Sequence, residues 1–309
     1  MALRGWLVCA LLLGQPALAA PNEARARLHD WKLAAISALA ARGDANSLAT
    51  AAMLSTAGGA ELAARASALA PESAPLAWIN LRLCAVTMGC DFRDAATAMR
   101  WVDADNPIAW LPTLDVAAHD RDAVEVERIL LDMSQGKRIM AYTVPVSVLM
   151  FDALEAVAPV LPRDVVGSDA SRLALVMAIA QARLVPVFTA LEDACRDSPS
   201  VPERRDACLK IARRLQRSDT VAGELAGIAI ERRTWPPDSH EARALAERRR
   251  TLEWQQRTAE RFDSPLLPWV KPRHTRWHLG QMRSLQREQD VLLAVMHEQK
   301  APASPPVLR

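Results

Sequence analysis

The sequence predicts an all-α protein, an α-solenoid of stacked antiparallel helix hairpins that becomes irregular in its C-terminal half. Ala, Leu and Arg dominate the 309 residues, whereas Tyr occurs once and Phe four times, and this composition favours helices over strands. We find no segment with the apolar–polar alternation of a half-buried strand. The phrase Pro75 to Trp78 returns 32 residues later as Pro107 to Trp110, and a period in the low thirties is typical of helix-hairpin solenoids.

The first element is a secretory signal peptide over residues 1–19. Arg4 gives a short basic region, Trp6 to Leu13 is apolar, and Ala17 to Ala19 offers a cleavage site of small residues. The apolar stretch is too short to span a bilayer core of ~30 Å. We therefore expect cleavage after Ala19 and a periplasmic or secreted protein.

Helices follow one another after the signal peptide, separated by short breaks at Gly, Pro, Asp and Asn. Asp44 and Asn106 are predicted N-caps, and Pro107 occupies the first helical position after Asn106. Apolar residues at helical spacing predict helices over 22–42, 44–59, 60–70, 75–88, 91–102, 107–118, 121–133, 140–157, 171–184, 187–196, 202–216, 219–232, 239–262 and 275–299.

Residues 20–300 are predicted to form one repeat-like helical domain, followed by a Pro-rich tail over 301–309. Its first part, 20–202, has 16 basic and 22 acidic residues, whereas 203–309 has 21 basic and 14 acidic residues. The basic half, 203–300, either meets an anionic partner or has ordinary solvated helix faces. Interleaved charges such as Glu203 to Asp206 favour the second interpretation, so no nucleic-acid partner is expected. No later segment has eighteen uninterrupted apolar residues, which predicts a mature chain without a transmembrane helix.

Four cysteines remain after processing: Cys84, Cys90, Cys195 and Cys208. An even number in an exported chain indicates two disulfides, for which the sequence allows three connectivities. We expect Cys84–Cys90 and Cys195–Cys208, because each pair straddles one turn between neighbouring helices. Closing a loop of this size stabilises a fold by ~3 kcal/mol in the chain-entropy model.

The segments Asp103 to Trp110 and Leu69 to Trp78 resemble the junction between tetratricopeptide repeats, where an Asp-Pro-rich turn leads into Ala-x-Ala-Trp-like sequence. Gly89 follows Trp78 by 11 residues, where that repeat also has a glycine at its internal turn, and Trp31 with Gly43 gives a weaker earlier copy. The resemblance covers roughly residues 31–133 and implies stacked hairpins that bind proteins or peptides. The wider pattern is similar to exported all-helical proteins of proteobacteria.

The chain departs from the repeat pattern in three places. Arg121 replaces the glycine that should follow Trp110, and 47 residues rather than about 34 separate Trp31 from Trp78. Ala85 and Ala117 occupy the slot of an expected aromatic residue.

Trp31, Trp78 and Trp110, together with Pro75, Pro107 and Gly89, are the predicted repeat-packing residues. Each hairpin has one apolar stripe that is too narrow to bury alone, so consecutive pairs must stack. Trp78 and Trp110 should therefore both be buried in equivalent layers.

Catalytic and metal-binding patterns are weak in this sequence, and we predict no catalytic, cofactor-binding or metal-binding residue. His274 and His278 lie four apart, but Thr275 stands where a zinc metalloprotease has Glu. We find no nucleophile elbow or phosphate-binding glycine loop.

The leading hypothesis is an exported scaffold protein of the periplasm or cell envelope that mediates protein–protein or peptide interaction. It is not expected to be an enzyme. The alternative is a cell-envelope polysaccharide hydrolase or lyase, which would need a raised-pKa carboxylate in a deep cleft.

We predict that the secreted chain begins at Ala20, because Ala17-Leu18-Ala19 fits the cleavage site and Pro21 is a poor first residue. Mass spectrometry of periplasmic material tests this prediction. Retention of Met1 would contradict export by this signal.

Overall fold

The computed structural model describes residues 21–196, 202–263 and 272–306, and these ranges contain helices and turns without a β-strand. The predicted all-α class is therefore confirmed, while the predicted signal peptide lies outside the described residues. The helices are α1 (Pro21–Arg42), α2 (Ala45–Leu54), α3 (Gly59–Leu69), α4 (Ala74–Ala85), α5 (Phe92–Val102), the 3-10 helix η1 (Pro107–Trp110), α6 (Leu111–His119), α7 (Ala123–Gln135), α8 (Thr143–Val157), the 3-10 helix η2 (Ala158–Val160), α9 (Asp169–Leu184), α10 (Thr189–Ala194), α11 (Pro202–Leu215), α12 (Val221–Arg233), α13 (His240–Asp263), α14 (Pro272–Ser284) and α15 (Glu288–Glu298).

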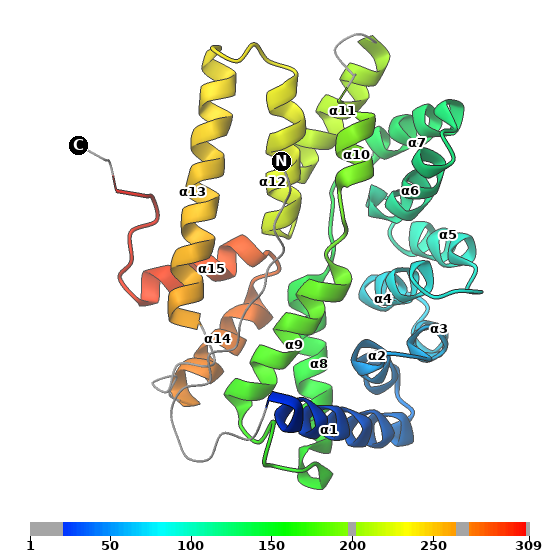
Figure 1. The fold of residues 1–309 in the computed structure, drawn as a ribbon, viewed down its shortest axis with the longest axis vertical. Helices are drawn as coiled ribbons and strands as arrows, with labels where there is room; N and C mark the ends of the chain where they lie inside the picture. Colours follow the sequence, from blue (N-terminus) through cyan, green and yellow to red (C-terminus); the bar gives the residue numbers. More distant parts are fainter. Residues whose placement is uncertain (1–20, 197–201, 264–271, 307–309) are drawn as a thin grey trace.

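The first half of the chain is an arc of consecutive helices, α1 to α7, along one side of the molecule (Figure 1). Short turns join α2 to α3, α4 to α5 and α6 to α7, and the two helices of each pair pack on each other. The pairs are also in contact, since α3 packs on α4 and α5 packs on η1. Side-chain caps help to start these helices: Asp44 accepts the Ser47 amide at 2.9 Å, and Asn106 accepts the Ile108 amide at 3.3 Å.

The second half turns back onto this arc instead of extending it. Helix α8 packs on α1 and α2, α9 packs on α2 and α4, α10 packs on α6, and α11 packs on α7. In a solenoid each repeat contacts only its neighbours, so these long-range contacts depart from the predicted architecture. Helices α12, α13 and α15 then continue outward from α11 (Figure 1).

Two central stretches are long and apolar enough to cross a membrane by length and composition: Thr143–Val160 and Asp169–Ala194. In the structure, 50% of an 18-residue apolar part of the first stretch is buried inside the protein, and 39% of the corresponding part of the second stretch is buried. The first stretch comprises α8 and η2, and the second comprises α9 and α10. Helices α8 and α9 pack on each other, on the arc and on α14, and this packing buries part of their apolar surface.

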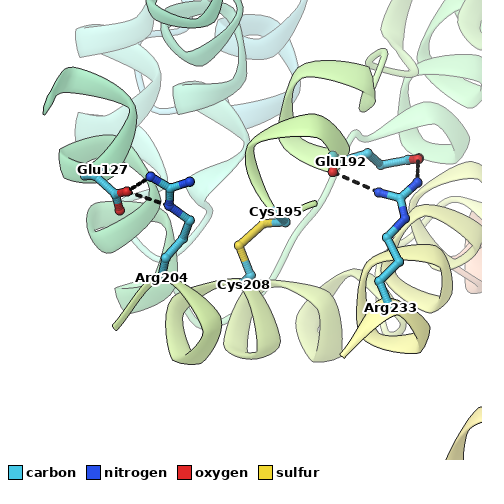
Figure 2. The surroundings of a disulfide bond; sticks show 6 residues. All are labelled: Glu127, Glu192, Cys195, Arg204, Cys208 and Arg233. Atoms are coloured by element: carbon cyan, nitrogen blue, oxygen red, sulfur yellow. Dashed lines mark hydrogen bonds and ion pairs between the residues drawn. A yellow bond between two sulfur atoms is a disulfide. The ribbon is translucent and has the colours of Figure 1, made fainter. Parts of the chain in front are cut away.

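Both disulfides have the predicted connectivity. Cys84–Cys90 closes the turn between α4 and α5 with a Cα separation of 5.3 Å, and Cys195–Cys208 joins the end of α10 to α11 with 5.7 Å. Figure 2 shows that the second disulfide lies between two ion pairs. Arg204 of α11 reaches Glu127 of α7, and Arg233 of α12 reaches Glu192 of α10. Helices α7, α10, α11 and α12 are thus linked side by side.

The predicted equivalence of Trp78 and Trp110 is wrong in one respect. Trp78 is 0% exposed, as expected, and Trp31 is 1% exposed, but Trp110 is only half-buried. Trp110 ends the 3-10 helix η1 instead of lying within a continuous helix over 107–118. Pro112 explains the interruption, because it has no N–H to donate to the carbonyl of Ile108. Pro107 is itself buried at the start of η1.

The turns that follow the two tryptophans each contain one residue with a positive φ, although they differ in length and sequence. Gly89, between α4 and α5, has φ +79°. Arg121, between α6 and α7, has φ +57°, a left-handed conformation that costs a non-glycine residue about 1–2 kcal/mol. Each residue follows its tryptophan by 11 positions. Arg121 therefore adopts the left-handed conformation in place of a glycine, at a higher conformational cost.

The predicted C-terminal helix over 275–299 is also wrong as a single element. It is divided into α14 and α15, and the tertiary contacts at the break explain why. The Glu288 amide donates to the Asp219 carbonyl at 2.8 Å, and Arg287 Nε donates to the Ser218 carbonyl at 3.1 Å. The turn between α11 and α12 thus binds the Glu288 amide, which would otherwise donate within a continuous helix, and holds the Arg287 side chain beside it.

The start of the Pro-rich tail, residues 301–303, contacts the rest of the protein. Trp254 Nε1 of α13 donates to the Pro302 carbonyl at 3.2 Å, and Gln255 Nε2 donates to the Ala303 carbonyl at 2.8 Å. This part of the tail is anchored on α13.

The burial of the tryptophans predicts unequal effects of substitution. Trp78→Ala should lower the free energy of unfolding by ~3–5 kcal/mol, because it empties a fully buried volume. Trp110→Ala should cost less, about 1–2 kcal/mol, since part of the ring faces solvent. Chemical denaturation of both variants provides the measurement. Equal losses, or a Trp78→Ala variant as stable as the parent, would contradict this packing.

Candidate functional site

One cavity, here named the arginine cavity, opens where the α2–α3 turn, the end of α4 and the end of α9 meet. Its volume is ≈ 520 Å³. Its lining residues are Ser55, Thr56, Ala57, Gly58, Gly59, Ala60, Arg82, Leu83, Val86, Thr87, Met88, Ala182 and Arg183. The site therefore combines two cationic side chains with backbone groups and small or apolar side chains.

The two arginines of this cavity are positioned by main-chain carbonyl groups. Arg82 Nε donates to the Arg183 carbonyl at 3.1 Å, and its Nη2 donates to the Val185 carbonyl at 3.3 Å. Arg183 donates to the carbonyls of Ala52 and Ser55, at 3.3 and 2.5 Å, at the end of α2. Both guanidiniums are thereby held between the hairpin array and α9.

The electrostatics of the arginine cavity leave its positive charge weakly compensated. Burial lowers the pKa of Arg82, and the carboxylate of Asp115 opposes that effect. Burial also lowers the pKa of Arg183, whose two described hydrogen-bond acceptors are the uncharged carbonyl oxygens of Ala52 and Ser55. Carbonyl acceptors satisfy N–H groups without neutralising a charge, so the cavity suits an anionic group.

The rim of the cavity is formed by the loop that the Cys84–Cys90 disulfide closes. Val86 is 74% exposed and Met88 is 100% exposed in this loop. The Thr87 amide donates to the Cys84 carbonyl at 3.0 Å, and the Cys90 amide donates to the Thr87 carbonyl at 3.2 Å. The disulfide and these turns hold two apolar side chains in solvent beside two cations.

A second concavity, the Trp110 groove, lies between α5 and α7 over α6 and has a volume of ≈ 440 Å³. The guanidinium carbons of Arg100 and Arg128 lie 4.2 and 5.1 Å from the centre of the Trp110 ring, within cation–π range. Arg128 is also paired with Glu125 at 2.6 Å and with Asp132 at 2.7 Å. The charges of this groove are therefore largely matched internally.

Two carboxyl groups with strongly raised pKa lie elsewhere, at the junction of α12 and α15. Burial raises the pKa of Asp219 to about 6, although the amides of Ala141 and Tyr142 donate to it at 2.7 and 2.6 Å. Burial raises the pKa of Glu288 to about 7, and the neighbouring Asp219 and Glu260 raise it further. We name Asp219 and Glu288 the acid junction.

The contacts of the acid junction are structural. Asp219 is 1% exposed, and both of its carboxylate oxygens accept backbone amides. Glu288 accepts Gln181 Nε2 of α9 at 2.6 Å and the Val221 amide of α12 at 2.9 Å. Neither group lines the arginine cavity or the Trp110 groove. Burial inside this contact between segments of the chain raises the pKa of both groups, and the hydrogen bonds they accept oppose that rise.

The histidine pair of the sequence lies in α14, which begins at Pro272 and so contains His274 as well as His278. His278 is buried, whereas His274 is partly exposed. Among the described residues, no group of three or more His, Cys, Asp and Glu side chains is arranged to hold a metal ion.

Comparison of the chain with protein-family models, curated proteins and solved structures returned no match. The geometry of its own residues is therefore the basis for any functional conclusion.

The predicted packing residues and the candidate site overlap only in part. Trp78 does not line the arginine cavity but contacts Arg82, whose guanidinium carbon lies 5.6 Å from the centre of its ring, and Trp110 lines the second groove. Sequence reasoning missed Arg82 and Arg183, which are 101 residues apart in the chain. The position of Arg82, four residues after Trp78 on the same helix, is the available sequence signal.

The acid junction predicts an unusual dependence of stability on pH. The folded pKa of each carboxyl lies above its ordinary value, 3.8 for Asp219 and 4.5 for Glu288, so the native state binds the proton more tightly than the unfolded state does. These two groups should raise the free energy of unfolding as the pH falls from about 8 to 5. The contribution of each group is complete at a pH below its pKa in the unfolded chain. The contribution of Asp219 is lost as the pH rises through about 6, and that of Glu288 is lost as the pH rises through about 7.

Glu288→Gln tests this effect, because it removes the charge and keeps one acceptor oxygen for the Val221 amide, while its NH2 group donates to the Gln181 side-chain oxygen after a flip of the Gln181 amide. At pH 8 the variant should be more stable than the parent by about 1–2 kcal/mol, a figure reduced to allow for the partial exposure of Glu288. Denaturant titrations at pH 5, 6, 7 and 8 measure both proteins, with Glu298→Gln at the exposed end of α15 as the control. A Glu288→Gln variant that is less stable at pH 8 and keeps the parent profile would contradict the assignment.

Proposed function

We propose that this protein is an exported helical-repeat scaffold of the periplasm or cell envelope, which binds a partner protein or peptide at the arginine cavity. One observation carries the proposal. Helices α8 to α11 cover one face of the hairpin array, while the arginine cavity stays open beside exposed apolar side chains. A partner is thus expected at the edge of the array, on the side of its internal turns.

Repeat-like geometry in residues 31–133 supports the scaffold class. The α4–α5 and α6–α7 turns share a left-handed residue 11 positions after a tryptophan. Consecutive helix pairs in this region pack on one another, as in arrays that bury their apolar stripes through neighbours. Such arrays commonly present binding surfaces, which agrees with the open cavity.

Two disulfides support the proposed location. Cys84–Cys90 and Cys195–Cys208 would persist in an oxidising compartment and would be reduced in most cytosols. The proposed cleavable signal peptide over residues 1–19 is consistent with such a compartment.

The alternative function, a polysaccharide hydrolase or lyase, needs an acid with a raised pKa that faces a substrate cleft. Asp219 and Glu288 have raised pKa values, but their oxygens accept groups of the protein itself. This arrangement favours the binding function over the enzyme.

Capture of a partner in the envelope tests the proposed function. A photo-reactive residue is placed at Met88, at the cavity rim, and at Val124, an 80% exposed position on α7, as the matched control. We expect one discrete crosslinked species at Met88 and none at Val124. Identical crosslinking at both positions, or none at either, would contradict partner binding at the arginine cavity.

A further inference from the structure

We propose that the arginine cavity binds the carboxylate of a peptide in which an apolar side chain stands next to that carboxylate. This inference rests on the proposed function and names the chemical group that the partner contributes.

The unused hydrogen-bond donors of the cavity point to an oxyanion. Each guanidinium has five N–H donors, and the carbonyl acceptors of Arg82 and Arg183 account for two nitrogens in each group. The remaining N–H groups belong to side chains that line the cavity. Carboxylates accept paired N–H groups of arginine in a bidentate geometry, which a neutral ligand does not match as well.

The positions of the two arginines are fixed before a ligand arrives. Arg183 holds the last carbonyls of α2, and Arg82 holds two carbonyls at the end of α9. Because these contacts restrict both side chains, binding an anion orders few additional rotatable bonds. The positive end of α3, whose N-cap Gly58 provides no side-chain acceptor, lies in the same wall and adds to the favourable potential.

The apolar rim favours a peptide over a small inorganic anion. Leu83 lines the cavity, and Val86 and Met88 stand in solvent beside it. An inorganic phosphate would leave these side chains uncovered. A peptide carboxylate with a neighbouring Leu, Met or Val would cover them, and burying apolar surface is favourable by roughly 25 cal/mol per Å².

Binding of small probes tests the chemistry separately from partner capture. N-acetyl-leucine presents a carboxylate beside an apolar side chain, N-acetyl-leucine amide lacks the charge, and inorganic phosphate lacks the apolar part. The readout is the NMR signal of the Met88 methyl group in protein labelled at methionine methyls, assigned with Met88→Leu. We expect millimolar binding of N-acetyl-leucine, as for a fragment of this size, and at least about tenfold weaker binding of its amide and of phosphate.

Two variants and one control locate the site. Arg183→Lys keeps the charge and removes the planar fork, so it should weaken N-acetyl-leucine binding about tenfold. Val86→Asp places a like charge at the rim and should weaken binding at least as much, without disturbing the fold, because Val86 is exposed. Val124→Asp carries the same change on α7 and should bind like the parent. Thermal melts check that the variants are folded.

Equal binding of N-acetyl-leucine and its amide would contradict recognition of a carboxylate by the cavity. Equal binding of phosphate would contradict the role of the neighbouring apolar side chain and leave a simple anion site. Unchanged binding in Arg183→Lys and Val86→Asp would overturn the location. If the Met88 crosslink to an envelope partner persists while no probe binds, the proposed ligand class is wrong and the proposed function stands. If N-acetyl-leucine binds and the Met88 crosslink is absent, the proposed ligand chemistry stands and the proposed function is wrong.

Discussion

The buried carboxylate of Asp219 is the contact on which the arrangement of the two halves depends. It accepts the amides of Ala141 and Tyr142, just before α8, while the backbone carbonyl of the same residue accepts the Glu288 amide at the start of α15. One residue in the α11–α12 turn therefore fixes the entry into α8 and the break between α14 and α15. Tyr142 is held at φ +57°, a conformation that costs a non-glycine residue about 1–2 kcal/mol and that these amide contacts sustain. A charge this deeply buried is tolerated because both oxygens are hydrogen-bonded.

This closure has a consequence for function. An open array of hairpins would expose one continuous face, but α8 to α10 lie against α2, α4 and α6. Helices α8 and α9 lie in stretches that are apolar enough, by composition, to cross a membrane, and this contact buries part of their apolar surface. The edge with the internal turns stays open, and the arginine cavity and the disulfide-closed loop lie there. The same contact that covers the array brings Arg183 of α9 next to Arg82 of α4, so closure of the fold creates the candidate site.

Local features of the fold could be predicted because they depend on residues close together in the sequence. The Cys84–Cys90 and Cys195–Cys208 pairs each span one turn, and Asp44, Asn106 and Gly89 act at helix ends through their own backbone neighbourhood. The break at Trp110 was also present in the sequence, since Pro112 removes a donor four residues after Ile108. The half-exposure of Trp110 follows from that interruption.

The sequence by itself determined the all-α class, most of the helix boundaries and the disulfide connectivity, because periodicity, caps and short loops act over a few residues. Only the tertiary structure decided that α8 to α11 return to the array, that the helix over 275–299 is divided, and that the start of the Pro-rich tail contacts α13. It also decided which of the many arginines line a cavity, since Arg82 and Arg183 meet across 101 residues of chain. Contacts between distant segments depend on how whole apolar faces and buried polar groups satisfy one another, and no local pattern encodes that pairing.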